Sequence, residues 1–273
     1  MLTNAKIKDI KKLNEKSKAR REAGLFVIEG PKMFIETPLE WIKEVYVTAD
    51  FLENADKGLL TDGSTSIRAA EMIQWMEHEV ISKDQMARIS DTQTPQGILC
   101  VVEQPAYTLD EIINLENKTS SKGRLFMILE DIQDPGNLGT IFRTAEGAGV
   151  SGIILSRGTV DIFNPKTIRS TMGSIYRVPF TYVDDLQAAI DMVKKAGITV
   201  YAAHLKGQKY HDEVEYRDAA FLIGNEGNGL KDETAALADT YIRIPMQGQL
   251  ESLNAAVASA ILMYEHNRQN RLK

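Results

Sequence analysis

The chain has 273 residues and a net charge of −6 at pH 7; 43% of its residues are hydrophobic and 26% are charged. This composition is typical of a soluble globular protein, and the length is enough for two ordinary domains. No apolar run approaches the roughly 18 residues that a membrane helix needs. A single cysteine, Cys100, excludes an internal disulfide and a cysteine-based zinc site, so we expect a cytoplasmic protein outside the membrane.

Residues 1–22 form a basic segment on an otherwise acidic chain. They hold eight basic and three acidic residues, a net charge of +5, which leaves −11 for the rest of the chain. This asymmetry is typical of a protein that contacts a phosphate backbone, although a charge run is also the ordinary composition of a solvated helix face. The segment has no apolar centre, so we do not interpret it as a secretory signal.

The first part of the chain alternates short helices and strands. A basic helix is predicted over 4–22, with Ile7, Ile10 and Leu13 as a sparse apolar stripe. Further helices begin at Pro31 and near Lys83, and 54–66 is loop-like. Strands are predicted over 26–30, 45–47, 80–81 and 98–102. We therefore predict a small α/β domain over 1–104, followed by a polar, turn-rich linker over 105–123.

From residue 124 the alternation of strands and helices becomes regular. Apolar strands are predicted over 125–129, 152–155, 178–183, 198–203, 219–223 and 241–244. Helices are predicted over 140–148, 164–173, 184–196 and 230–238, and a last helix follows Ser252, its expected N-cap. The pattern predicts a parallel-sheet α/β domain over 124–273, in which ligands bind at the carboxyl ends of the strands. The polar loops at 130–139, 224–229 and 246–252 should lie on that edge.

The first of these loops contains Asn137 and Gly139 and leads to Arg143. It lacks both the Gly-Lys-Ser/Thr of a phosphate-binding loop and a Gly-x-Gly-x-x-Gly fingerprint, which disfavours an ATP site or a nucleotide-dependent oxidoreductase. Arg143 is either a structural arginine or a ligand of an anionic substrate. We favour the substrate, because a cation near the start of a helix is disfavoured unless it has such a use.

The other two loops are also suited to holding a ligand. The second has three glycines in six residues, Gly224, Gly227 and Gly229, which allow left-handed backbone angles and close approach of a ligand. Glu226 is its single charge. The third loop lies between a short apolar strand and an Ala-rich helix, and a polar loop held between two buried elements is rigid.

Together the three loops resemble the motifs of one enzyme family. Residues 137–145, then 223–227, then 244–246 with 251–254 are similar, in order and spacing, to motifs one, two and three of the SpoU/TrmH family of SPOUT-class RNA ribose 2′-O-methyltransferases. The resemblance covers 125–268 and includes 164–173. In the N-terminal part, 12–13, 26–30 and 90–98 resemble the RNA substrate-binding domain that many rRNA-modifying members carry.

This resemblance implies a trefoil-knotted α/β-knot domain, a homodimer with its active site near the interface, and S-adenosylmethionine as the cofactor. It implies six cofactor-binding residues: Gly224, Asn225, Gly227, Ile244, Met246 and Leu253. It implies five residues in the polar catalytic site: Asn137, Arg143, Glu226, Ser252 and Asn254.

The implied chemistry suits these residue types. A ribose 2′-hydroxyl is a poor nucleophile at neutral pH and must lose its proton as it attacks the sulfonium methyl group, so positioning supplies much of the barrier reduction. Arg143 either acts as the base or orients the hydroxyl and the neighbouring phosphate. Because the pKa of arginine lies above ~12, we favour orientation. No step needs a metal ion.

The predicted partner is RNA, with large-subunit rRNA favoured over tRNA because of the N-terminal resemblance. Five basic residues are predicted to contact the RNA: Lys11, Lys12, Lys16, Arg20 and Arg169. The alternative from another class is a catalytically inert RNA-binding protein that acts in ribosome assembly. The intact set of polar motif residues disfavours it.

Overall fold

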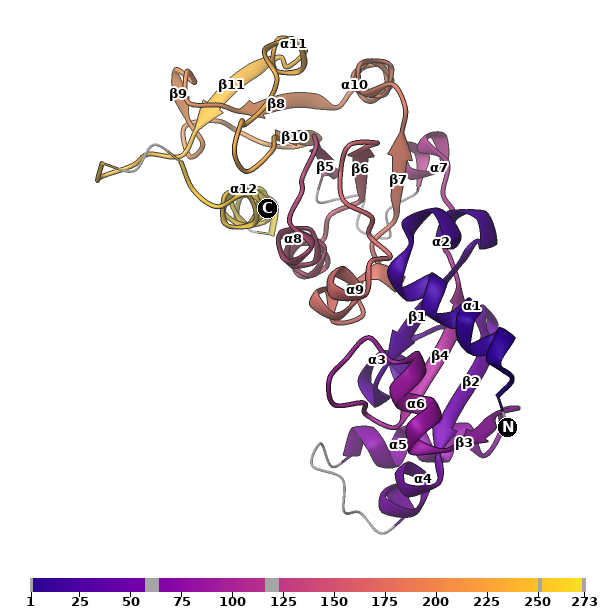
Figure 1. Ribbon diagram of the computed structural model, residues 1–273. Helices are drawn as coiled ribbons and strands as arrows, with labels where there is room; N and C mark the ends of the chain where they lie inside the picture. The colour runs from indigo at the N-terminus through magenta and orange to yellow at the C-terminus, as the bar shows by residue number, and fades with distance from the viewer. Residues whose placement is uncertain (1, 57–63, 116–122, 250–251, 272–273) are drawn as a thin grey trace. The chain divides into compact units, whose positions relative to one another are not determined.

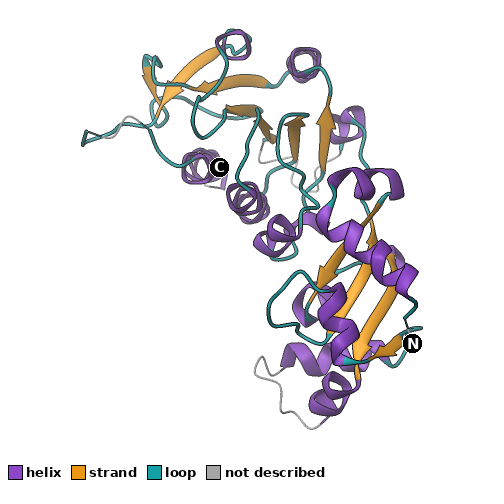
Figure 2. Cartoon of the chain, in the orientation of Figure 1, coloured by secondary structure: helices purple, strands orange, loops and turns teal. Residues whose placement is uncertain are grey.

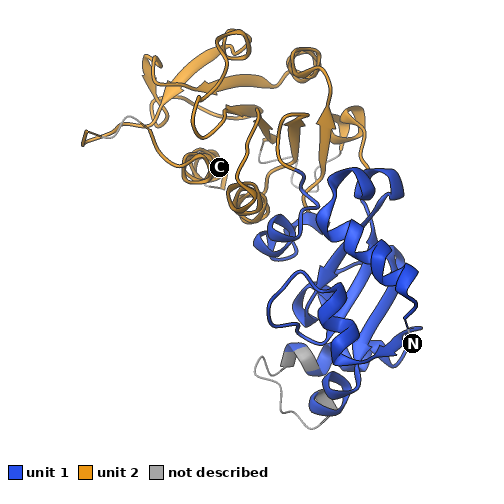
Figure 3. Ribbon diagram, in the orientation of Figure 1, with its two compact units in different colours: residues 1–105, 161–176 blue, residues 106–160, 177–273 orange. Residues whose placement is uncertain are grey.

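The computed structural model describes residues 2–56, 64–115, 123–249 and 252–271 (Figure 1). The chain forms two compact units, one from Met1–Pro105 with Asp161–Tyr176 and the other from Ala106–Val160 with Arg177–Lys273 (Figure 3). The segment Asp161–Tyr176 thus belongs to the first unit, although in sequence it lies within the predicted catalytic domain.

The first unit is built on a four-stranded sheet with the strand order β1-β4-β2-β3. Its strands are β1 (Leu25–Glu29), β2 (Ile42–Thr48), β3 (Glu79–Ile81) and β4 (Ile98–Glu103). Strand β4 pairs antiparallel with β1 and β2, and β2 pairs parallel with β3. Cys100 is buried in β4.

Short helices complete the first unit. They are α1 (Asn4–Glu15), α2 (Ser17–Ala23), α3 (Pro31–Glu36), α4 (Ala49–Asp56), α5 (Ser64–Ile73), α6 (Lys83–Ile89) and α9 (Pro165–Thr171), with the 3-10 turns η1 (Leu39–Trp41) and η3 (Ser174–Tyr176). The predicted apolar stripe of α1 is confirmed, because Ile7, Ile10 and Leu13 are buried.

Two of the predicted boundaries in the first unit are wrong. The basic helix predicted over 4–22 breaks at Lys16, whose backbone is extended with φ −123° and ψ 111°. The stretch 54–66 is not simply a loop, since α4 and α5 reach into it from either side. Residues 57–63 of that stretch lie outside the described residues.

The second unit is built on a seven-stranded sheet with the order β7-β6-β5-β10-β8-β11-β9. Its strands are β5 (Leu125–Leu129), β6 (Gly152–Ser156), β7 (Phe180–Val183), β8 (Thr199–Ala203), β9 (Lys209–Tyr210), β10 (Ala219–Ile223) and β11 (Thr240–Arg243). Every neighbouring pair is parallel. All residues of β5, β6 and β10 are buried, as expected of parallel strands covered on both faces. The predicted parallel sheet is confirmed.

Helices cover both faces of this sheet (Figure 2). They are α7 (Leu109–Asn114), α8 (Pro135–Ala148), α10 (Leu186–Lys195), α11 (Asp232–Ala235) and α12 (Ala255–Arg271). Side chains of α7 and α10 share one apolar core with β5, β6, β8 and β10, while α8 and α12 pack against one another. Helix α7 falls within the predicted linker, yet its Ile112 and Ile113 are buried in this core.

Candidate active site

The candidate site lies at the carboxyl end of the sheet in the second unit. Strands β5 and β10 are neighbours and parallel, so the segments that follow Leu129 and Ile223 leave the sheet side by side. The segments after β8 and β11 emerge at the same edge, because β11 pairs parallel with β8 and β8 with β10. This is the edge at which open α/β sheets bind ligands.

Helix α8 begins earlier than the sequence pattern predicts. Asp134 is its N-cap, accepting a hydrogen bond from the backbone N–H of Asn137 at 2.8 Å, and Pro135 occupies the first turn. Asn137 therefore lies in the first turn, and exposed Arg143 lies about two turns further along. The effect of the helix dipole fades within the first turn. The prediction that the helix dipole disfavours Arg143 was therefore wrong, and the case for this residue rests on its exposure and on the motif that contains it.

Three predicted catalytic residues form one hydrogen-bonded chain. Asn137 Nδ2 donates to Glu226 Oε1 at 3.0 Å, and Asn254 Nδ2 donates to Asn137 Oδ1 at 2.9 Å. Glu226 also accepts from the backbone N–H groups of Gln133 and Asp134. Burial opposes ionisation of Glu226, but these hydrogen bonds outweigh it and hold the pKa of the carboxyl below its ordinary value. The chain of contacts joins all three motifs.

Asn254 has a second use as the N-cap of helix α12. Its Oδ1 accepts from the backbone N–H of Ala256 at 2.9 Å and of Val257 at 3.2 Å. The prediction that Ser252 caps this helix was wrong, because α12 begins only at Ala255. Ser252 instead lines the cavity described below.

The glycine-rich segment 224–229 folds back on itself. The backbone N–H of Asn225 donates to the carbonyl of Gly229 at 3.0 Å, and the reverse bond is 2.8 Å long. Asn225 Oδ1 accepts from the N–H groups of Gly227 and Asn228 inside this turn. A Cβ atom on Gly224 would lie 2.1 Å from the Gly229 carbonyl carbon and from the Leu230 nitrogen. Only glycine fits there.

This turn forms one wall of a cavity of about 320 Å³. All six residues predicted to bind the cofactor line it: Gly224, Asn225, Gly227, Ile244, Met246 and Leu253. Glu226 and Ser252 of the predicted catalytic set also line it, whereas Asn137, Arg143 and Asn254 do not. The volume falls within the range of about 300–1000 Å³ that is usual for small-molecule sites.

One wall of this cavity was not predicted from the sequence. Ala203, His204 and Leu205 line it from the segment that follows β8. The His204 ring lies 5.2 Å from the ring of Tyr241, and its Nδ1 accepts from the backbone N–H of Lys206 at 3.1 Å. The position of this wall could have been predicted, because the strand predicted over 198–203 ends at the same edge of the sheet as the three polar loops.

The basic residues predicted to contact RNA have different surroundings in the first unit. Lys11, Lys12 and Lys16 are exposed, and Lys12 Nζ donates to Asp9 at 2.9 Å. Arg20 is only 2% exposed. Three contacts occupy its guanidinium: Asp161, the carbonyl of Leu13 and the carbonyl of Asn14. We therefore correct the expectation for Arg20, because its contacts give it a structural role within the first unit.

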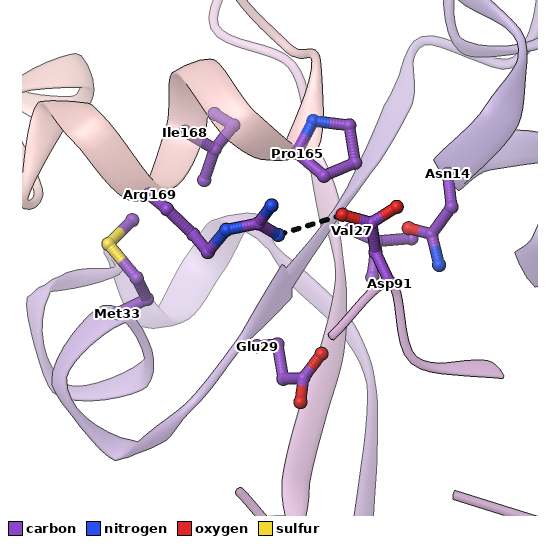
Figure 4. Close-up of a pocket in the computed structure, with 8 residues that line it drawn as sticks. All are labelled: Asn14, Val27, Glu29, Met33, Asp91, Pro165, Ile168 and Arg169. Atoms are coloured by element: carbon purple, nitrogen blue, oxygen red, sulfur yellow. Dashed lines mark hydrogen bonds and ion pairs between the residues drawn. The ribbon is translucent and has the colours of Figure 1, made fainter. Parts of the chain in front are cut away.

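Arg169 lies in a small cleft of the first unit (Figure 4). Its Nη1 donates to Asp91 Oδ2 at 2.9 Å, and both side chains are 40% exposed. Glu29 lies nearby in the same cleft and accepts hydrogen bonds from Ser90 and Thr92. Arg169 is thus paired, but it retains exposed surface.

Two kinds of feature are absent from the described residues, a metal-binding cluster and a membrane-spanning helix. No group of three or more His, Cys, Asp or Glu side chains in that part of the chain is arranged to hold a metal ion. No helix among the same residues is long and apolar enough to cross a membrane.

Two protein families match this chain. The SpoU rRNA Methylase family matches residues 124–264, and the MRM3-like substrate binding domain matches residues 4–100. The chain is 34% identical over 262 residues to the 23S rRNA (guanosine(2553)-2'-O)-methyltransferase RlmP of Bacillus subtilis, covering 96% of this chain and 95% of that protein.

Solved structures of similar proteins share the whole fold. The SpoU methyltransferase AviRb from Streptomyces viridochromogenes, in complex with the cofactor AdoMet, has a TM-score of 0.83 at 25% identity and covers 99% of both chains. The AdoMet-bound rRNA methyltransferase from Sinorhizobium meliloti has a TM-score of 0.80 at 32% identity, covering 98% of this chain and 96% of that one.

The chain therefore belongs to the SpoU rRNA methylase family. The predicted fold class is confirmed: an α/β-knot methyltransferase domain preceded by a small α/β substrate-binding domain. The predicted enzyme class, an RNA 2′-O-ribose methyltransferase that uses S-adenosylmethionine, is also confirmed. The residues that line the cavity fit this cofactor, because the apolar side chains of Ile244, Met246 and Leu253 lie beside the polar groups of the glycine-rich turn in a cavity of the size usual for small-molecule sites.

Proposed function

We propose that this enzyme methylates a ribose 2′-hydroxyl in large-subunit rRNA, with RNA captured by the first unit and the methyl group transferred in the second. The observation that carries the proposal is the cavity of the second unit, with the chain of hydrogen bonds from Glu226 through Asn137 to Asn254 joining its motifs. The choice of rRNA is supported by the N-terminal match to a substrate-binding domain and by the name of the Bacillus subtilis relative.

One set of site residues holds the cofactor, and another set orients the RNA. S-adenosylmethionine supplies an electrophilic methyl group on a sulfonium sulfur. The backbone of Gly224 and Gly227, with Ile244, Met246 and Leu253, forms the cradle for it. The glycine turn is closed by its own backbone hydrogen bonds, which restrict its conformations and so lower the ordering cost of binding.

The polar residues orient the nucleotide. Glu226 is committed to accepting hydrogen bonds from Asn137 and the backbone N–H groups of Gln133 and Asp134, so its role is to fix Asn137 rather than to remove the proton. Arg143 is exposed, and its guanidinium offers five N–H donors in a fixed planar arrangement. It can bind the nucleotide phosphate and stabilise the negative charge that develops on the ribose oxygen. Ser252, on the cavity wall, can hydrogen-bond the nucleotide.

The test uses S-adenosylmethionine with a tritiated methyl group and three separate RNA pools: large-subunit rRNA, small-subunit rRNA and tRNA. We expect label in the large-subunit rRNA alone. Label in tRNA alone would establish the alternative tRNA substrate. Cofactor binding without transfer to any pool would support the inert assembly factor. The large-subunit rRNA should come from a strain that lacks this gene, because an already modified nucleotide cannot accept the methyl group.

We also propose that the enzyme is a homodimer that pairs through α12. Val257 is 47% exposed and Tyr264 is 50% exposed. They are seven residues apart, or about two helical turns, and therefore share one face. Light scattering tests this proposal: replacement of both residues by Glu should reduce the mass to that of one chain, and an unchanged dimer mass would exclude this face.

We further propose a cytoplasmic location, which is consistent with an rRNA substrate. Cell fractionation tests it.

A further inference from the structure

Asp131 has an unusual backbone conformation at the edge of the active site. Its φ is +53°, and among the described residues Met172 is the only other residue besides glycine with a positive φ. Asp131 follows β5 by two residues and does not line the cavity. A left-handed conformation is strained for most side-chain-bearing residues, and although Asp adopts it more readily than most, it persists where the surroundings favour it.

The carboxylate of Asp131 enforces this conformation through contacts on two sides. Ser156 Oγ donates to Oδ1 at 2.7 Å and also accepts from the Asp131 N–H at 2.8 Å. Lys231 Nζ pairs with Oδ2 at 2.8 Å. Space for Oδ1 exists because residue 158 is glycine, whose Cβ would otherwise lie 2.0 Å from it. The hydrogen bond from Lys231 is the main cause that lowers the pKa of Asp131, so the carboxylate is charged at neutral pH.

The carbonyl of Asp131 is directed at the glycine-rich turn as a result. Asn225 Nδ2 donates to it at 2.8 Å, and Gln133 Nε2 donates to it at 3.0 Å. The amide oxygen of the same Asn225 side chain accepts from the N–H groups of Gly227 and Asn228. The Asn225 side chain is therefore fixed at both ends, with Asp131 outside the turn and the backbone of the turn inside.

The far end of the turn is held by the neighbouring residue. Glu130 is 3% exposed, and its Oε2 accepts from the backbone N–H of Lys231 at 2.9 Å. Its Oε1 accepts from the Thr234 hydroxyl at 2.5 Å. Lys231 is thus held by its N–H through Glu130 and by its ammonium through Asp131. Two consecutive residues after β5 hold both ends of the segment 225–231.

We propose that Asp131 is a positioning residue that holds the 225–231 segment in its cofactor-binding shape by directing its own carbonyl at Asn225. This inference rests on the proposed function only in taking the cavity beside the turn as the cofactor site. Asp131 does not line the cavity, so its effect passes through Asn225. It should change cofactor affinity and the order of the turn while leaving the maximal rate of transfer nearly unchanged.

Three variants separate the backbone conformation from the carboxylate. Asp131→Asn tolerates the left-handed conformation and keeps a side chain that can bond Ser156, so S-adenosylmethionine affinity should stay within about threefold of the native value. Asp131→Gly permits the conformation without enforcing it, so the loss should be intermediate. Asp131→Val resists the conformation and has no carboxylate, so affinity should fall at least about tenfold, which corresponds to about 1.4 kcal/mol.

The matched control is Met172→Val, which places the same β-branched side chain at the other positive φ, in the first unit. It should lower the melting temperature, as Asp131→Val does, but leave cofactor affinity unchanged. Calorimetric titration of S-adenosylmethionine measures affinity. Hydrogen exchange of the Gly227 and Asn228 amides in the free protein measures the order of the turn, and Asp131→Val should speed it at least about tenfold.

Native affinity and native exchange in both Asp131→Val and Asp131→Gly would overturn the proposal. Equal loss of affinity in Met172→Val would also overturn it, because general destabilisation would then explain the effect. The exchange measurement needs no cofactor. Native protein that fails to bind S-adenosylmethionine, with or without rRNA, would therefore refute the cofactor site, whereas exchange that does not respond to Asp131 would refute the positioning role.

Discussion

Gly224→Ala tests the cofactor cradle with the smallest possible change. The added Cβ would lie 2.1 Å from both the Gly229 carbonyl carbon and the Leu230 nitrogen, where Cβ atoms essentially never come within 3.0 Å of another atom. These neighbours are backbone atoms, so no side-chain rotation relieves the clash and the turn must open by roughly 1 Å. Overpacking of this kind costs about 1–3 kcal/mol. If the clash destabilises the cofactor-bound conformation of the turn by this amount relative to the free protein, the affinity for S-adenosylmethionine falls between about 5-fold and about 150-fold.

The control for this substitution lies in the third loop, at Gly248, which does not line the cavity. A Cβ on Gly248 would have no neighbour within 4 Å, and Gly248 is not among the glycines with a positive φ. Gly248→Ala should therefore bind the cofactor within about twofold of the native protein. Calorimetric titration of both variants, well below their melting temperatures, measures the difference. Native affinity in Gly224→Ala would refute the reasoning, because the turn would then not be the cradle.

Three further predictions follow from the polar site and the basic segment. Arg143→Ala should lower the rate of methyl transfer at least about 100-fold and leave cofactor affinity nearly native; unchanged transfer in a single-turnover assay would remove Arg143 from the site. Asn254→Ala should lower the free energy of unfolding by about 1 kcal/mol through loss of the α12 cap, whereas Ser252→Ala should not; equal denaturation midpoints would contradict the assignment of the cap. The remaining prediction concerns three exposed lysines: Lys11, Lys12 and Lys16. Their reversal to Glu should weaken rRNA binding and reduce its salt slope by about one for each lysine that contacts phosphate; an unaltered slope would exclude this segment from the RNA surface.

The sheet and its functional edge were predictable because they depend on short-range patterns. Continuous apolar runs such as 125–129 and 219–223 indicate strands buried on both faces, and both runs are strands in the structure. The glycine spacing of 224–229 likewise indicated a tight turn, which the bridge between Asn225 and Gly229 forms. All six predicted cofactor residues meet in one cavity because they follow strands of one parallel sheet.

Helix boundaries were less predictable because neighbouring polar residues compete as caps. Ser252 and Asn254 are both good N-caps, and sequence alone does not show which one the helix selects. Asn254 is the cap in the structure. While its Oδ1 caps the helix, its Nδ2 donates to Asn137, a contact between residues 117 positions apart. The start of α8 at Pro135 has a similar cause, since the loop before it is tied to Glu226.

Long-range contacts also decide the use of individual charged residues. Arg20 belongs to a basic run and was expected to face RNA, but Asp161, 141 positions away, pairs with it inside the first unit. Asp131 and Lys231 form an ion pair across 100 positions, and no spacing rule connects them. Such pairs depend on which strands become neighbours, and short-range pattern does not specify that order.

The most direct test of the central claim is the chemical position of the transferred methyl group. Large-subunit rRNA from a strain lacking this gene is incubated with the purified protein and S-adenosylmethionine that carries a deuterated methyl group. The RNA is then digested to nucleosides for mass spectrometry. We expect a single labelled nucleoside whose label stays with the ribose when the base is lost. Label on a base, or no label while the protein binds both cofactor and rRNA, would contradict it.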